Sequence, residues 1–212
     1  MKKLIFTIAL FVASFISQAT DNERFMQAMG QTLMELGKAK DAIALQEVAN
    51  KFERIASSET TEWLPNYYAA LCYNMIAYKQ KEGAEIDKYL DKSDTFIEKL
   101  SKQNVSSPDE VEVIKAQNYM IRISVDGQSR WMKYNSAFES AVAKAKEINP
   151  ENPRAYVLKA QMVYNTPVQF GGGPEKACPE VQEANAKFAN FKPTSPIAPT
   201  WGSDQMKRMV CK

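Results

Sequence analysis

Residues 138–184 constrain the fold of this chain most strongly, because small residues recur there at helical spacing between sharp chain breaks. The stretch predicts a helix that ends at the proline-bounded turn of residues 149–153, then a second helix. A glycine run at residues 171–173 follows, and Pro174 suits the first position of a third helix. We therefore expect an antiparallel helical hairpin that packs through alanine, with further hairpins stacked on it.

The rest of the chain has the same helical pattern. Apolar residues recur at spacings of three and four, and no stretch alternates strictly enough to predict a strand. The pattern predicts about eight helices in four pairs. Ser107, Pro108 and Glu110 predict a helix start with a serine cap and a glutamate that returns the hydrogen bond. That helix, about residues 108–125, is apolar on two sides and is expected to be sandwiched. The predicted fold is all-α, with paired helices that bury their apolar faces against neighbours.

Several small residues stand where tetratricopeptide repeats have theirs. Ala145 and Pro150 match the last small residue and the closing proline of one repeat, and Tyr156 and Ala160 match the opening pair of the next. The second helix of that repeat is matched by Ala177, Val181 and Ala184. Residues 165–173 depart from the pattern by adding about five residues. The chain thus resembles exported tetratricopeptide-like proteins of bacteria, and the resemblance implies an α-α superhelix that serves as an interaction scaffold.

The first 19 residues have the layout of a secretory signal peptide. Lys2 and Lys3 precede an apolar run over residues 4–16, and Ser17 and Ala19 supply small residues at the two positions that a signal peptidase inspects before the expected cut after Ala19. The run is short for a membrane span, and no cysteine near the cleavage point offers a lipid anchor. We expect a periplasmic or secreted protein without stable membrane insertion; the alternative is an uncleaved amino-terminal anchor.

After cleavage, a helical repeat domain is expected over residues 20–191, and a proline-rich arm with a short helix over residues 192–212. Loss of Lys2 and Lys3 leaves 25 basic residues against 25 acidic ones. Nucleic acid requires a basic face, so a nucleic-acid partner is not expected.

The 212 residues include no histidine, which excludes Ser-His-Asp and Cys-His catalysis and metals bound through imidazole. Two carboxylate pairs are expected to be solvated surface charge: Asp87 with Asp91, and Glu110 with Glu112. The glycine run lacks the lysine and serine or threonine of a nucleotide loop, so backbone geometry is its expected role. We predict no catalytic, cofactor-binding or metal-binding residues.

Two further pairs of residues are candidates for special roles. In an oxidising compartment, a bond between Cys178 and Cys211 would hold the arm on the helices and contribute about 3 kcal/mol. Three cysteines allow three single pairings, and Cys72 is expected to be a buried thiol. Tyr68 and Tyr73 lie off the main apolar seam of their helix and are candidates for lining a concave partner-binding face. Packing in the core is the alternative for both rings.

Three functions remain compatible with the sequence. The first is a non-enzymatic exported scaffold that binds a protein or peptide in the cell envelope. The second is a periplasmic accessory protein that binds a small solute for a transport system. The third, a hydrolase that uses a carboxylate pair, has no motif in its favour.

Overall fold

The computed structural model describes residues 22–211, and all regular secondary structure in that range is helical. The predicted signal peptide, residues 1–19, lies outside the described residues. A helix over residues 22–38 comes first. It is followed by α2 (Ala42–Ser58), α3 (Leu64–Lys79), α4 (Gly83–Lys102), α5 (Pro108–Val125), α6 (Gly127–Ile148), α7 (Pro153–Asn165), the 3₁₀ turn η1 (Val168–Phe170), α8 (Pro174–Asn190) and α9 (Ser203–Met206). The prediction of an all-α fold is confirmed.

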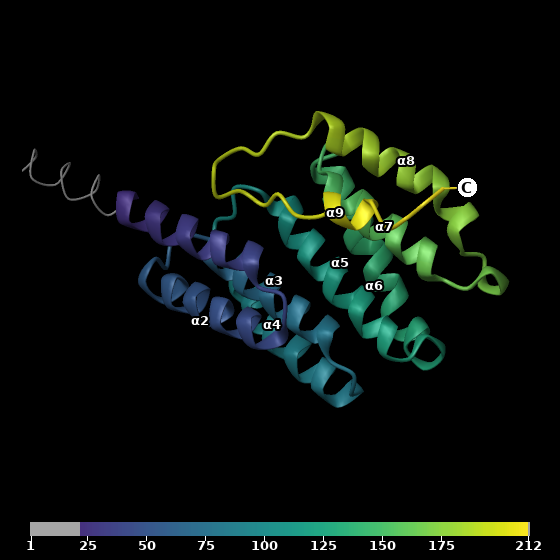
Figure 1. Cartoon of the computed structure of the whole chain (residues 1–212), viewed down its shortest axis with the longest axis horizontal. Coiled ribbons are helices and arrows are strands. Elements are labelled where there is room, and N and C mark those ends of the chain that lie inside the picture. The colour runs from purple at the N-terminus through teal and green to yellow at the C-terminus, as the bar shows by residue number, and fades with distance from the viewer. Residues whose placement is uncertain (1–21, 212) are drawn as a thin grey trace, which may run out of the picture.

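Helices that follow one another in the chain pack side by side (Figure 1). The most extensive contacts join α5 with α6, α3 with both α2 and α4, and α7 with α8. The connections are short, and a short loop between helices brings its two helices together as antiparallel neighbours. The expected packing of helical hairpins is therefore confirmed. Among residues 22–211, no helix has both the length and the apolar content that crossing a bilayer requires.

Local signals explain where most of these helices begin. The side chains of Asp41, Asp126 and Asn152 each accept a hydrogen bond from a backbone N–H in the first turn. Helix α5 begins at Pro108, as the sequence predicts, but Ser107 makes no side-chain cap hydrogen bond. Glu110 does not return a bond to the cap either, because its carboxylate points into the core.

The small residues of the predicted repeat lie in the core. Ala145, Ala160, Ala177 and Ala184 are fully buried, and Val181 is 3% exposed. They belong to two apolar clusters. One is formed by residues of α5, α6 and α7, and the other lies mainly between α7 and α8. Tyr156 is also buried, and its hydroxyl donates a hydrogen bond to the exposed Pro150 carbonyl at 2.9 Å. Small side chains thus stand where these helices approach closely.

Replacing Ala145 or Ala160 by phenylalanine should lower the free energy of unfolding by about 1–3 kcal/mol, because neither site has room for a ring. Urea denaturation followed by circular dichroism measures the change. The same substitution at Ala186, which is exposed on α8, is the control and should leave the midpoint nearly unchanged. Core variants that unfold at the wild-type midpoint would show that these alanines do not limit helix packing.

The arm that follows α8 runs back across the helices, drawn in yellow in Figure 1. Ile197 is buried in the largest apolar cluster, and Trp201 packs partly against that cluster and its neighbour. Polar groups hold the backbone as well: the Tyr68 hydroxyl donates to the Ile197 carbonyl at 2.8 Å, and the Arg154 Nη1 donates to the Pro199 carbonyl at 3.0 Å. The arm therefore completes the core.

The structure pairs Cys178 with Cys211, whose Cα atoms are 5.4 Å apart, while Cys72 is buried and free. The pairing closes a loop across 33 residues. Replacing both paired cysteines by serine should lower stability by about 3 kcal/mol, because the unfolded chain gains the freedom that the bond removes. Mass analysis of peptides under non-reducing conditions identifies the bond, and recovery of both thiols free would contradict it. A thiol reductant should destabilise the wild type and leave the double-serine variant unchanged, which tests whether the loss is specific to the bond.

Candidate functional site

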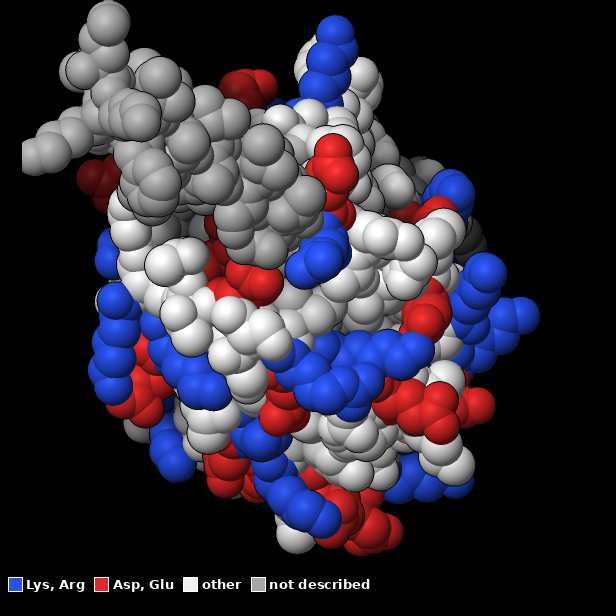
Figure 2. All heavy atoms as spheres, turned by 90° about the vertical axis from the view of Figure 1, so that its left-hand side faces the viewer, with Lys and Arg blue, Asp and Glu red and all other residues white. Residues whose placement is uncertain are grey.

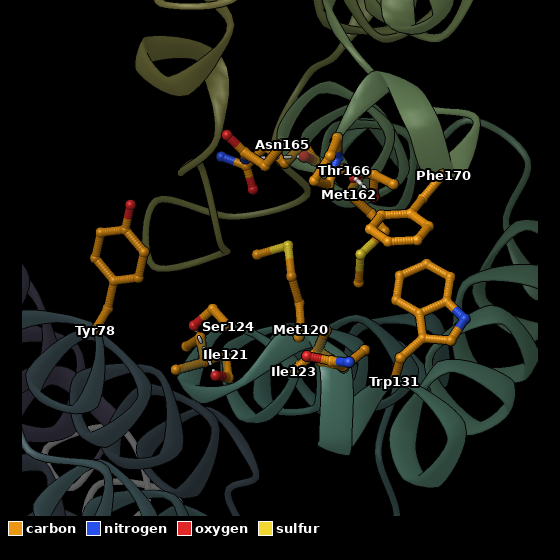
Figure 3. Close-up of a pocket in the computed structure, with 14 residues that line it drawn as sticks. Tyr78, Met120, Ile121, Ile123, Ser124, Trp131, Met162, Asn165, Thr166 and Phe170 are labelled. Carbon is orange, nitrogen blue, oxygen red and sulfur yellow. Dashed lines mark hydrogen bonds between the residues drawn. The ribbon is translucent and has the colours of Figure 1, made fainter.

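A groove of about 860 Å³ lies between α5, the start of α6 and the end of α7. Helix α5 contributes Met120 and Ile123 to its floor, and α6 contributes Trp131 (Figure 3). Met162 of α7 and Phe170 of η1 line the opposite wall. The volume falls in the range of about 300–1,000 Å³ that is typical of small-molecule sites.

No charged side chain is among the fourteen residues that line this groove. Several of its polar side chains donate hydrogen bonds to backbone carbonyls of the helix that carries or precedes them. The Ser124 hydroxyl donates to the Ile121 carbonyl, and the Thr166 hydroxyl donates to the Met162 carbonyl, both at 2.7 Å. The Asn165 amide likewise donates to the carbonyl of Gln161 at 2.9 Å. The lining therefore suits an apolar part of a ligand, and the charged groups of that ligand would have to lie outside the groove.

Three aromatic rings of the lining are open to solvent. Phe170 is 74% exposed, Tyr78 is 71% exposed and Trp131 is 37% exposed. Figure 3 shows Trp131 and Phe170 together at one end of the groove, Tyr78 at the other, and the Met120 thioether between them. Large apolar side chains gathered around a concavity indicate a binding site, since each could be covered by a ligand. Methionine adds a flexible, polarisable surface.

The sequence does not predict this groove as a site. Tyr68 and Tyr73 are the residues predicted to bind a partner, yet both are only 3% exposed. The Tyr68 ring stacks on Phe52 with centroids 5.1 Å apart, and the Tyr73 hydroxyl accepts a hydrogen bond from Gln46. These two rings pack in the core and present no open face to a partner. One signal did point to the groove: the second apolar side of α5, which includes Met120 and Ile123.

Glu110 is buried, which corrects the expectation of solvated charge. It is 2% exposed, and its Oε1 accepts hydrogen bonds from Arg154 Nε at 2.8 Å and from Asn152 Nδ2 at 2.7 Å. Its Oε2 accepts from the Tyr67 hydroxyl at 2.7 Å, and that hydroxyl accepts from the Trp201 indole. Burial and the nearby Glu110 charge raise the pKa of Tyr67. Both oxygens of Glu110 thus accept hydrogen bonds, so the carboxylate is not available as a base. Through these bonds it joins α3, α5, α7 and the arm.

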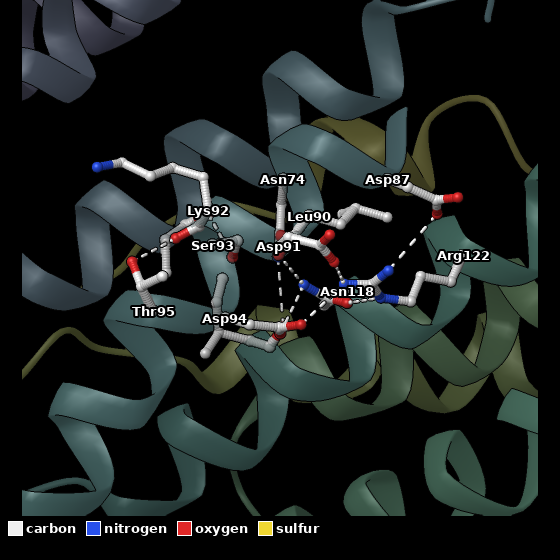
Figure 4. Close-up of polar contacts among 12 residues, drawn as sticks. Asn74, Asp87, Leu90, Asp91, Lys92, Ser93, Asp94, Thr95, Asn118 and Arg122 are labelled. Carbon is white, nitrogen blue, oxygen red and sulfur yellow. Dashed lines mark hydrogen bonds and ion pairs between the residues drawn. The ribbon is translucent and has the colours of Figure 1, made fainter. Parts of the chain in front are cut away.

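Glu112 is also buried, at 8% exposed, and Lys115 donates a hydrogen bond to it at 2.9 Å. The other pair that was expected to be solvated, Asp87 with Asp91, lies beside arginine (Figure 4). Arg122 donates to Asp91 at 2.7 Å and to Asp94 at 2.8 Å, which joins α5 to α4.

Asp87 belongs to the same ionic cluster. Arg130 at the start of α6 donates two hydrogen bonds to its carboxylate, at 2.6 and 2.7 Å, and this contact lowers the pKa of Asp87. Within the described part of the chain, no group of three or more histidine, cysteine or acidic residues is placed to hold a metal ion. On the face shown in Figure 2, basic and acidic side chains are intermixed over most of the surface. The ion pairs of Arg122 and Arg130 link helices to one another. The groove is therefore the candidate site.

Comparisons with known proteins agree with the fold. No family model matches the chain, and no curated protein sequence matches it. The structure is similar to that of the HusA haemophore from Porphyromonas gingivalis, with a TM-score of 0.77 and 29% sequence identity. The match covers 87% of this chain and 90% of the haemophore. The two proteins therefore share the helical fold over most of their lengths.

Proposed function

We propose that this protein is an exported, non-enzymatic binding protein that holds a porphyrin such as haem in the groove between α5, α6 and α7. The observation that carries the proposal is the uncharged lining with exposed aromatic rings. Its support comes from the haemophore that shares this fold at 29% identity, because a haemophore by its name carries haem. Cleavage of residues 1–19 would deliver the groove outside the cytoplasm, and the paired helices would be of the tetratricopeptide type.

The chemistry of a porphyrin suits the groove. The ligand is a broad, flat and apolar ring whose charged carboxylates stand at one edge. Its faces could pack on Met120 and Met162 and against the ring of Trp131, while the carboxylates remain in water at the mouth. A flat aromatic ligand also gains from offset stacking on exposed rings.

Few side chains of the groove could bind the iron of haem. With histidine absent from the sequence, the lining groups of a kind that ligates haem iron are the thioethers of Met120 and Met162 and the phenol of Tyr78. We expect apolar contact to supply most of the affinity, so the metal-free ring should bind as well. This small-ligand role is favoured over a peptide scaffold, since Tyr68 and Tyr73 are buried.

A titration of the chain from residue 20 onward with haem, and separately with metal-free protoporphyrin, tests the proposal. Saturable binding of both at one site per chain is expected, seen as a shift of the porphyrin absorption band. Serum albumin, which binds many apolar molecules, and a linear fatty acid serve as the reference protein and reference ligand. Absence of saturable binding of either porphyrin would rule the proposal out.

A further inference from the structure

The loop between α7 and α8 is held by backbone hydrogen bonds, both within itself and to α7. The Gly173 N–H donates to the Val163 carbonyl of α7 at 2.9 Å, and the Phe170 N–H donates to the Pro167 carbonyl at 2.9 Å. Gly171 and Gly173 have φ values of 83° and 102°, in the region that glycine adopts most readily. These bonds and angles fold the loop back onto the last turn of α7.

Gly172 is the point of closest approach in this loop. A Cβ atom at this position would lie 2.3 Å from the Thr166 carbonyl oxygen and 2.7 Å from the Val163 carbonyl oxygen. Both are backbone atoms, so no change of side-chain rotamer can relieve the clash. The loop can therefore dock on α7 in this arrangement only with glycine at residue 172.

The base of the loop is buried and its tip is not. Gly172 and Gly173 are buried, whereas Phe170 is 74% exposed and lines the groove next to Trp131 (Figure 3). An apolar ring held at the mouth of an apolar groove by a fixed backbone is organised before a ligand arrives. Such preorganisation strengthens binding, because less chain entropy is lost on association.

We propose that residues 166–173 form a rigid clamp in which Phe170 contacts the flat face of the porphyrin and Gly172 is the positioning residue. The inference rests on the proposed function and adds to it the part of the chain that closes the groove. It also gives a role to the residues that make this loop longer than the turn of a tetratricopeptide repeat.

Two variants test the clamp by porphyrin titration. Phe170→Ala removes the ring without moving the backbone, and Gly172→Ala displaces the loop without removing the ring. Each should weaken the binding of metal-free protoporphyrin about tenfold, the effect of losing one aromatic contact. Gly30→Ala is the matched control, since no atom lies within 4 Å of its added Cβ, and it should bind as the wild type does.

Chymotrypsin cleavage after Phe170 provides a readout that does not depend on the ligand. Cleavage should be at least several times faster in Gly172→Ala than in the wild type or in Gly30→Ala, because the loop leaves α7. Wild-type affinity in both Phe170→Ala and Gly172→Ala would overturn the clamp alone. Failure of the wild type to bind any porphyrin would overturn the proposed function, and unchanged cleavage in Gly172→Ala would overturn the rigid loop separately.

Discussion

Replacing Glu110 by glutamine should lower the free energy of unfolding by about 3–5 kcal/mol, because the buried Arg154 then loses the carboxylate that pairs with it directly. The side chains of Glu110 and Arg154 are 3% and 4% exposed. The carboxylate also accepts from Asn152 and Tyr67, so a neutral amide would leave some of these donors without a good partner. Urea denaturation followed by circular dichroism measures the loss.

The matched control is Glu98→Gln, which breaks the exposed pair of Glu98 with Lys102 on α4. Solvent screens that pair, so the midpoint should hardly move. Adding Arg154→Met to Glu110→Gln should recover part of the stability, because the unpaired charge is gone. A Glu110→Gln variant as stable as the wild type would show that this ion pair does not hold the arm to the helices.

Replacing Met120 by aspartate should weaken porphyrin binding by a factor of about 100 or more. The ligand would have to remove water from a new carboxylate in a groove whose lining carries no charge, at a cost of a few kcal/mol. Met120 is only partly buried, so the folded protein can solvate the new charge when no ligand is bound. Absorption titration with metal-free protoporphyrin measures the loss, and circular dichroism verifies the helical fold.

Met132→Asp is the matched control for this experiment. Met132 is 91% exposed on α6 and does not line the groove, so the same substitution there should leave the affinity unchanged. Equal affinities for Met120→Asp and the wild type would place the porphyrin elsewhere. Equal losses in both variants would indicate that net charge, and not the groove, controls binding.

The helices could be predicted from the sequence because their signals are local. Proline at the first position of α5 and α8 and the period of apolar residues along each helix specify where helices form and which face is buried. Within the predicted arm of residues 192–212, the short helix α9 spans only Ser203–Met206. A helix of four residues has too few apolar positions for its length to be inferred from periodicity.

The groove could not be predicted because it depends on which helices meet. Periodicity places Met120 and Ile121 on two apolar sides of one helix, but it does not say that Ile121 is 4% exposed and Met120 faces the groove. Glu110 presents the same difficulty, since its partner Arg154 is 44 residues away. Its place in the sequence fits a helix cap, and only the packing of α7 on α5 makes it half of a buried ion pair.

A titration of ¹⁵N-labelled protein with metal-free protoporphyrin, followed amide by amide in NMR spectra, shows where the ligand binds. The proposal predicts that the largest shifts fall on residues of the groove, among them Met120, Ser124, Trp131 and Thr166. Amides of α2, on the far side of α3, should hardly change. Saturable shifts centred on α2 or on the charged surface, with the groove unaffected, would contradict the claim that this groove is the binding site.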